Sequence, residues 1–394
     1  MLLSGLKVID WSGWLAGPGC AAIMADWGAD VIKVEPPTGD PVRAAQYDAS
    51  TGEPAGPSFT LDNRGKRSVA LDVGKPAGRR AMLALLEGAD VLITNFRPGG
   101  QKRLGLDYDS LKDRFPRLVF ASITAFGLEG EEADKPGFDM TVFWGRSGAG
   151  RATIPRDQEP YPNRPGFGDH TASIATLAGV LAALRERDRT GRGRLVDVSL
   201  LRVGVYAIGA DLANHLRYGA AHTAVPRRER PVANAGYFRT ADDRWIGLVP
   251  RGKADFPLLM RALDLPEYAD DPRCLPPVSD PALNEALRRA IDAAFARLTL
   301  EEAGARLDRA DLGWGLLATL TEVETDPQAH AAGCFVEQPD GVGGSFLAPA
   351  SPVRFPGLDI GPAGPAPRLG EHGAEVLREA GLTEAEIAAA LDGG

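Results

Sequence analysis

Two glycine-rich segments carry residues whose types and spacing could do chemistry. The first, Gly17-Pro18-Gly19-Cys20-Ala21-Ala22, reads G-x-G-x-x-A after an apolar run, and Glu35 follows Gly17 by 18 positions, as in a dinucleotide-binding fingerprint. Pro18, however, removes a backbone N–H from the middle of the loop, and alanine replaces the third glycine. We therefore expect no NAD cofactor at this segment.

The second segment is Gly166-Phe167-Gly168-Asp169-His170, directly before a long apolar helical pattern. Asp169 has two interpretations: an ordinary N-cap of that helix, or a nucleophilic carboxylate that the helix N-terminus keeps ionised and the glycines expose. The residues alone leave both open. Because adjacent residues at a helix start point in different directions, we expect no shared catalytic role for His170 and Asp169.

Other kinds of catalytic centre lack their sequence patterns. Cys20, Cys274 and Cys334 lie far apart with no C-x-x-C spacing, and the histidines show no metal-ligand spacing, so we expect no metal site. There is also no G-x-S-x-G nucleophile elbow and no P-loop.

Size and charge narrow the function classes. A chain of 394 residues favours two domains, and a net charge of -9 without a basic stripe argues against nucleic acid as a partner. No window reaches 18 uncharged apolar residues, and the first residues lack the pattern of a secretory signal. We expect a cytoplasmic protein with no membrane partner.

Short apolar strands alternate with amphipathic helices over the first 200 residues, which predicts an α/β fold with a mostly parallel sheet. Gly17 to Gly19 are expected to turn the chain from the first strand into the first helix. The predicted strands are 6–11, 30–35, 68–72, 90–94, 118–123 and 195–200, and the predicted helices are 20–27, 76–87, 104–111 and 171–187.

The composition changes after about residue 222, where a Pro- and Arg-rich stretch begins. A hairpin over 237–249 and helices over 254–263 and 281–307 predict a smaller α+β domain, followed by a loop-like tail that ends in a helix over 371–380. The predicted domains are 1–222, 223–335 and a C-terminal segment, 336–394, that returns to the large domain.

Several stretches together resemble one known family. They are LxGLxVIDxSxxLAGPxC at 2–20, GADVIKVEPP at 28–37, DNRGKRSVALD at 62–72, ADVLITNFRPG at 89–99, RLGLDYDSL at 103–111, KPGFD at 135–139, the Gly168-Asp169 step and TGRGRLVDVSL at 190–200. Weaker similarities, TDPQ at 325–328 and LGEHGAEVL at 369–377, extend almost to the end. On these residues the chain resembles the class III CoA-transferases, which include formyl-CoA and carnitine CoA-transferases and have α-methylacyl-CoA racemase as a relative.

The resemblance implies a Rossmann-like large domain, a smaller α+β domain and an interlocked homodimer. It also implies that Asp169 is the nucleophile, which attacks an acyl-CoA thioester to give a mixed anhydride and then an aspartyl-CoA thioester. A carboxylic acid would then take the CoA. The resemblance thus implies acyl-CoA as the substrate. Because the free energy of the thioester is retained throughout, it also implies that no metal or ATP is needed.

The resemblance assigns the ligand contacts residue by residue. Backbone atoms of Ala16 would approach CoA. The nucleotide pocket would be lined by Leu71, Asn95 and Phe96. The basic side chains of Arg103 and Lys135 would meet the phosphates.

The acyl group would meet a different set of residues. Leu15 stands where formyl-CoA transferase has glutamine, and Val249-Pro250-Arg251-Gly252-Lys253 replaces its Gly-rich lid, so we expect a larger apolar or aromatic acid rather than oxalate. The candidate pocket residues are Trp14, Leu15, Phe138, Asp139, Phe143 and Trp144.

Two alternatives remain. A racemase would need an imidazole before the Asp of a G-H-D segment, whereas this chain reads Gly137-Phe138-Asp139. A non-catalytic CoA-binding protein would bind CoA without exchanging it between acids.

Overall fold

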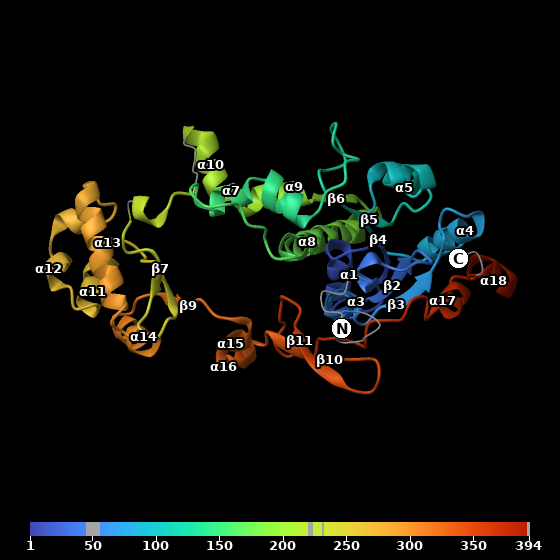
Figure 1. The fold of residues 1–394 in the computed structure, drawn as a ribbon. Helices are drawn as coiled ribbons and strands as arrows, with labels where there is room; N and C mark the ends of the chain where they lie inside the picture. Colours follow the sequence, from blue (N-terminus) through green and yellow to red (C-terminus); the bar gives the residue numbers. More distant parts are fainter. Residues whose placement is uncertain (45–55, 220–223, 231, 392–394) are drawn as a thin grey trace. The chain divides into compact units, whose positions relative to one another are not determined.

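The computed structural model describes residues 1–44, 56–219, 224–230 and 232–391, which fall into two compact units. Unit 1 comprises Met1–Ile154, Glu159–Thr223 and His330–Gly394, and unit 2 comprises Pro155–Gln158 and Ala224–Ala329. Segments from both halves of the chain therefore build unit 1 (Figure 1).

A sheet of six parallel strands lies at the centre of unit 1, in the order β3-β2-β1-β4-β5-β6. This is the strand order of a doubly wound nucleotide-binding sheet. The strands are β1 Lys7–Trp11, β2 Asp30–Glu35, β3 Arg67–Ala70, β4 Val91–Thr94, β5 Val119–Thr124 and β6 Leu195–Ser199. Every residue of β4 and β5 is buried, as expected for central strands that are covered on both faces. The predicted parallel α/β architecture is confirmed.

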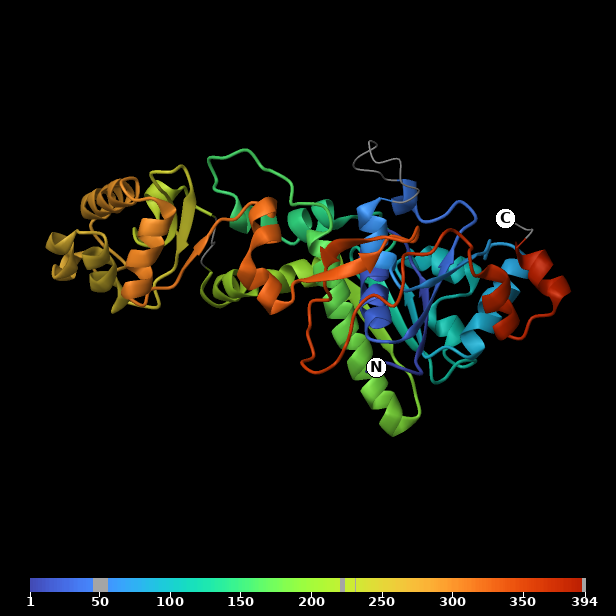
Figure 2. The same ribbon diagram turned by 90° about the horizontal axis from the view of Figure 1, so that it is seen from below.

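Helices cover both faces of this sheet (Figure 2). Val8 and Val91 point to the layer of α1 and α8, whereas the next residues, Ile9 and Leu92, point to the layer of α4, α17 and α18. The helices of these two layers are α1 Ala16–Asp26, α8 Phe167–Thr190, α4 Pro76–Glu87, α17 Gly373–Glu379 and α18 Glu384–Leu391. Shorter helices join them: α2 Pro41–Ala44, α3 Pro57–Asn63, α5 Pro98–Leu104, α6 Tyr108–Leu111, the π-helix η1 Asp139–Arg146, α7 Ala149–Thr153, α9 Leu200–Ala207 and α10 Gly209–Tyr218.

The turn between β1 and α1 differs from the prediction. Gly17 and Gly19 lie inside the first turn of α1, and the left-handed residue of the connection is Trp14, with φ 61°. The glycines serve close packing instead: a Cβ on Gly17 would lie 2.3 Å from Ser12 Oγ, and one on Gly19 would lie 2.8 Å from Ser173 Oγ.

The C-terminal segment is more regular than the loop-like tail that was predicted. Strands β10 Phe335–Pro339 and β11 Ser345–Pro349 form an antiparallel hairpin, and α18 follows the helix predicted near residue 375. Val376 and Ile387 complete the core beneath α4, so this segment is an integral part of unit 1.

Unit 2 contains a three-stranded antiparallel sheet packed against helices around a core of its own. The helix predicted over 281–307 is two helices, because Thr299 caps the second one and Glu302 bonds back to its N–H. The elements are η2 Arg227–Glu229, β7 Gly236–Arg239, β8 Trp245–Leu248, α11 Asp255–Ala262, α12 Pro266–Ala269, η3 Pro272–Cys274, α13 Pro281–Phe295, α14 Leu300–Arg309, β9 Trp314–Leu316 and α15 Leu320–Thr325, and α16 Pro327–Ala332 crosses to unit 1.

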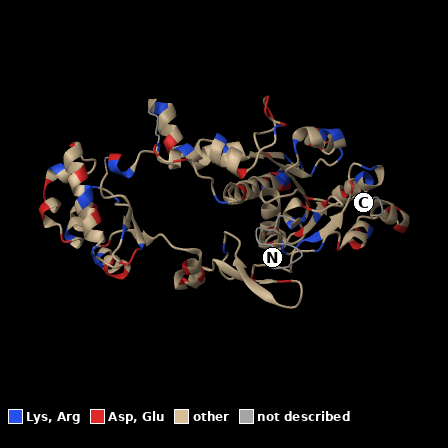
Figure 3. Ribbon diagram, in the orientation of Figure 1, with Lys and Arg blue, Asp and Glu red and all other residues tan. Residues whose placement is uncertain are grey.

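Charge is dispersed over both units, with basic and acidic residues interspersed along the helices (Figure 3). One helix among the described residues, α8, is long and apolar enough by length and composition to cross a membrane. Ala172, Val180 and Leu184 of α8 belong to the core that α8 shares with α1 and the sheet.

Candidate active site

The site lies at the carboxyl ends of β1 and β4, where the strand order reverses and doubly wound sheets bind ligands. Gly13 after β1 and Asn95 after β4 are joined there: Gly13 N donates to Asn95 Oδ1 (3.0 Å), and Asn95 Nδ2 donates to Gly13 O (2.6 Å). A cavity of about 600 Å³ opens beside them, bounded by 14–16, 95–98 and 123–125 and by residues within 133–140 and 162–169. This volume suits a cofactor-sized ligand.

A second cavity of about 340 Å³ adjoins the first, since Phe96 and Arg97 line both. Leu71 and Arg103 lie in its wall. The Arg103 guanidinium makes no hydrogen bond or ion pair with any residue that the structure describes, so it is available to an anion. Asp169 lines the larger of these two adjoining cavities.

Asp169 is the third residue of α8, in its first turn, and lines the larger cavity. The N-cap interpretation is wrong, because the N-cap residue is Gly166, at φ 84°, and no side chain caps the helix. Two glycines allow this start: Gly166 adopts a left-handed conformation, and a Cβ on Gly168 would lie 2.3 Å from Phe143 Cγ. Among the described residues, none makes a hydrogen bond or ion pair with the Asp169 carboxylate.

The surroundings of Asp169 favour its neutral form. Burial, and after it the nearby Asp139 carboxylate, raise the pKa of Asp169 to about 7, with Asp62 adding to this and His170 opposing it. Asp139 is held in place by Gly168 N, which donates to Oδ2 (3.1 Å), and by Asn163 Nδ2, which donates to Oδ1 (2.5 Å). The site thus holds a carboxylate that titrates near neutral pH and has free lone pairs, as a nucleophile requires.

His170 has a partner of its own. Its Nε2 lies 3.2 Å from both carboxylate oxygens of Asp62, and this hydrogen bond raises the pKa of His170. His170 does not line the cavity, so the two neighbouring side chains point in different directions, as expected.

Most predicted site residues come together at these two cavities. The larger cavity is lined by Trp14, Leu15, Ala16, Asn95, Phe96, Lys135, Phe138, Asp139 and Asp169, and the smaller one by Leu71, Phe96 and Arg103. Lys135 Nζ is paired with Glu132 Oε1 at 2.7 Å.

Two predicted pocket residues line neither cavity. Phe143 is buried and packs edge-on against Phe167. Trp144 donates its Nε1–H to Tyr161 O (2.9 Å). The π-helix η1 turns both side chains toward α8 and the segment before it, a direction that their sequence positions did not indicate.

The sequence reasoning missed several polar or flexible side chains of the larger cavity, among them Arg97, Met140, Asn163 and Arg164. Arg97 directly follows Asn95 and Phe96 at the end of β4, and this position was a usable signal. Arg164 lies five residues before Asp169, and its guanidinium has no partner among the described residues.

The Glu35 carboxylate, which stood where a dinucleotide fingerprint has its ribose ligand, is buried and accepts hydrogen bonds from Arg43, Ser68 and Asp40 N. Within the described ranges, no group of three or more His, Cys, Asp or Glu residues could hold a metal ion.

A doubly wound parallel sheet with a cofactor-sized cavity at its switch point defines an α/β protein of the nucleotide-binding kind. The chain belongs to CoA-transferase family III, whose model matches residues 3–373. The resemblance noted in the sequence is thereby confirmed.

Named relatives extend over nearly the whole chain. The (R)-2-hydroxy-4-methylpentanoate CoA-transferase of Clostridioides difficile is 32% identical, with 98% of this chain and 97% of that protein covered. The cinnamoyl-CoA:phenyllactate CoA-transferase of Clostridium sporogenes is 31% identical, with 98% and 95% covered. The crystal structure of a CaiB/BaiF family protein from Brucella suis matches with a TM-score of 0.82 and 30% identity, over 96% of this chain and 98% of that one.

Proposed function

We propose that this protein moves CoA from an acyl-CoA thioester to a free carboxylic acid, with Asp169 as the nucleophile. The observation that carries the proposal is the Asp169 carboxylate itself, which lines the cavity and is bonded to no described residue. Every other acid that contacts it electrostatically, Asp139 and Asp62, is engaged in hydrogen bonds.

The first half of the reaction forms an enzyme-bound thioester. An Asp169 oxygen attacks the thioester carbonyl, the C–S bond breaks, and CoA leaves as a thiolate. The thiolate then attacks the Asp169 carbonyl of the mixed anhydride, which releases the donor acid and leaves an aspartyl-CoA thioester. Asp169 lies in the first turn of α8, where the helix dipole favours the negative charge that develops on the thioester oxygen during the attack.

The second half repeats these steps with the acceptor. The acceptor carboxylate attacks the aspartyl thioester and expels the CoA thiolate, forming a second anhydride. The thiolate then attacks the acceptor's carbonyl, which gives the new acyl-CoA and frees the Asp169 carboxylate. A pKa near 7 suits both halves, since the carboxylate is more nucleophilic than an ordinary one and is still ionised above neutral pH.

We assign CoA to the two adjoining cavities, which share Phe96 and Arg97 in their walls. The Arg103 guanidinium, which pairs with no described residue, lies in the smaller cavity and suits the nucleotide phosphates, and Arg97, which lines both cavities, suits the pyrophosphate. Lys135 is a weaker candidate because Glu132 already neutralises it.

For the acyl group we propose a bulky apolar side chain. Trp14 and Phe138 meet edge-to-face at the larger cavity, with ring centroids 5.6 Å apart, and Leu15 and Met140 extend the apolar wall. Two of the relatives act, by name, on acids with a phenyl or branched alkyl side chain, which agrees with this wall.

The decisive experiment is a screen of CoA donors, succinyl-CoA included, against a panel of carboxylic acids with mass-spectrometric detection. Transfer that Asp169→Ala abolishes, together with hydroxylamine or borohydride modification of Asp169 after incubation with acyl-CoA, supports the proposal. Normal turnover by Asp169→Ala contradicts it. Loss of α-deuterium from a 2-methylacyl-CoA without an acceptor would indicate a racemase, and CoA binding without label exchange would indicate a binding protein.

We also propose that the protein acts as a homodimer in the cytoplasm. Helix α10 has no buried residue, and Tyr206, Leu216 and Tyr218 on α9 and α10 are more than 70% exposed. Exposed apolar side chains at this density are typical of protein interfaces. Sedimentation velocity at micromolar concentration tests this, and a monomer would contradict it.

A further inference from the structure

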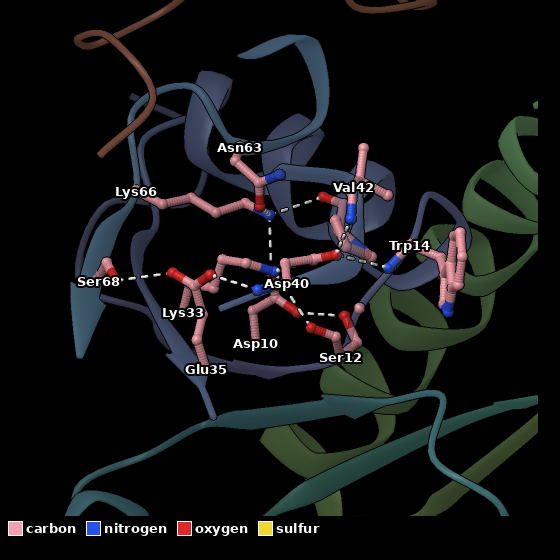
Figure 4. A network of polar contacts seen from close by, with 12 residues as sticks. Asp10, Ser12, Trp14, Lys33, Glu35, Asp40, Val42, Asn63, Lys66 and Ser68 are labelled. Atoms are coloured by element: carbon pink, nitrogen blue, oxygen red, sulfur yellow. Dashed lines mark hydrogen bonds and ion pairs between the residues drawn. The ribbon is translucent and has the colours of Figure 1, made fainter. Parts of the chain in front are cut away.

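Four charged side chains lie completely buried behind the loop that connects β1 to α1 (Figure 4). Lys33 Nζ lies 2.8 Å from Asp40 Oδ2 and 3.9 Å from Asp10 Oδ2, and Lys66 Nζ lies 2.7 Å from Asp10 Oδ2. None of the four lines either cavity, so they do not reach a bound substrate.

Three of their other hydrogen bonds involve the backbone around the loop, while Ser12 Oγ, Asn63 Oδ1 and Val42 N take part in the rest. Lys33 Nζ donates to Ser12 O (3.1 Å), Lys66 Nζ donates to Pro18 O (2.9 Å), and Trp14 N donates to Asp40 Oδ1 (3.1 Å). The loop is thereby bonded at its start, at its middle and at the first turn of α1.

Asn95 holds the same loop from the side of β4. Both ends of its carboxamide are used by Gly13, through the donor and acceptor bonds described above. The oxygen and the nitrogen of the Asn95 carboxamide are thus each engaged once by Gly13, and the residue also lines the cavity.

These hydrogen bonds hold the backbone of Trp14 in a strained conformation. Trp14 has φ 61°, and a bulky residue in the left-handed region is strained by about 1–3 kcal/mol. This backbone directs the indole to the cavity mouth, where it is 45% exposed and packs edge-on against Phe138. Strain of this kind persists only where the surroundings over-determine it, and it gathers at functional sites.

We propose that Lys33, Asp40 and Asn95 are positioning residues that hold Trp14 over the cavity and thereby set which acyl groups reach Asp169. This rests on the proposed function. Stability alone does not account for the buried pair, because apolar residues of similar volume are often as stable as a buried ion pair or more so. What the pair supplies is a carboxylate oxygen in a fixed position, which accepts the hydrogen bond that Trp14 N donates.

The first test is amide hydrogen exchange of the full chain, which needs no activity. In Lys33→Met/Asp40→Leu, which removes both charges together, peptides covering 12–16 should exchange at least about tenfold faster than in the wild type. The matched control is Asp26→Leu/Arg64→Met, which removes another buried ion pair, with no bond to 12–16. Unchanged exchange at 12–16 in the first variant overturns the positioning role, whatever the protein catalyses.

The second test is a mutant cycle on acceptor selectivity, the ratio of kcat/KM for 3-phenylpropionate to that for butyrate. Trp14→Gly, which keeps the positive φ and removes the indole, should lower the ratio roughly tenfold, and Lys33→Met/Asp40→Leu should lower it similarly. Combining all three substitutions should add nothing further, because the pair acts through Trp14. Effects that multiply, or an unchanged ratio in Trp14→Gly, overturn the proposal.

Two further measurements keep the outcome clear. Asn95→Ala, which removes both hydrogen bonds to Gly13 and leaves the buried charges in place, carries the same cycle if the double variant does not fold. Trp245→Ala, on a tryptophan of similar exposure in unit 2, should leave the ratio unchanged. Absence of transfer to any acid by the wild type would contradict the proposed function, while the exchange result would still decide whether the network holds the loop.

Discussion

The Oδ2 atom of Asp139 accepts a hydrogen bond from the backbone N–H of Gly168, 3.1 Å away, and this bond ties a second carboxylate to the residue just before Asp169. Asp139 is also bonded to Asn163 and is only 6% exposed. Its negative charge therefore stays near Asp169, and after burial it is the strongest cause that raises the pKa of Asp169 to about 7. The nucleophile's ionisation is set by a neighbour that the chain fixes in place.

Asp139→Asn should shift the pH dependence of transfer. The amide keeps an acceptor for Gly168 N but removes the charge, so the pKa of Asp169 falls and the acid limb of kcat/KM, near pH 7 in the wild type, moves down by about one unit. Initial rates from pH 5 to 9 measure it. Asp107→Asn, at the N-cap of α6, is the control and should leave the limb in place. An acid limb that does not move in Asp139→Asn would show that the charge of Asp139 does not raise the pKa of Asp169.

Asp169→Asn should abolish transfer and stabilise the fold at alkaline pH. Because the pKa of Asp169 is raised in the folded state, its contribution to stability is fully present below the unfolded pKa of 3.8 and is lost as pH rises through about 7. At pH 8 the ionised wild-type carboxylate destabilises the folded state, so Asp169→Asn should raise the free energy of unfolding by about 2 kcal/mol. At pH 4 this difference from the wild type should vanish. Urea unfolding at both pH values checks this, and an equal difference at both would contradict it.

Gly168→Ala should disable the site through packing. The added Cβ would lie 2.3 Å from Phe143 Cγ and 2.5 Å from Asp139 Oδ1, so the start of α8 must shift. We expect kcat to fall by about a hundredfold, with a loss of stability of about 1–3 kcal/mol. Gly209→Ala, where a Cβ meets nothing within 4 Å, is the matched control, and steady-state kinetics compare the two. Full activity in Gly168→Ala would mean that the helix start is not critical.

Local patterns predicted much of the sheet and its order of strands and helices. The helix at Pro76–Glu87 and the strand at Asp30–Glu35 have the predicted bounds. In each segment the spacing of the apolar residues by itself indicates the element, a helix in the first and a strand in the second. The start of α8 was missed because it depends on the left-handed Gly166, and the break before Leu300 was missed although Thr299 and Glu302 form a recognisable capping box.

The site was predictable to the extent that its residues follow strands. Asn95 and Phe96 directly follow β4 and line the cavity, as expected at the carboxyl end of a strand in a doubly wound sheet. The direction of Phe143 and the partners of Lys33 depend on contacts between segments far apart in the chain, and no single stretch contains that information. Trp14 adopts a left-handed backbone conformation, which a bulky residue disfavours and which sequence reasoning assigns to glycine.

Arg103 should bind the nucleotide end of CoA. Its guanidinium has no partner among the described residues and faces the smaller cavity, so Arg103→Ala should raise KM for acyl-CoA about tenfold and leave KM for the matching acyl-pantetheine, which lacks the nucleotide, unchanged. Lys135→Ala should have a smaller effect because Glu132 already pairs with Lys135. Lys102→Ala, one residue away on α5 and outside both cavities, is the control. Equal losses with acyl-CoA and acyl-pantetheine would assign Arg103 to the acyl end or to the fold, and not to the phosphates.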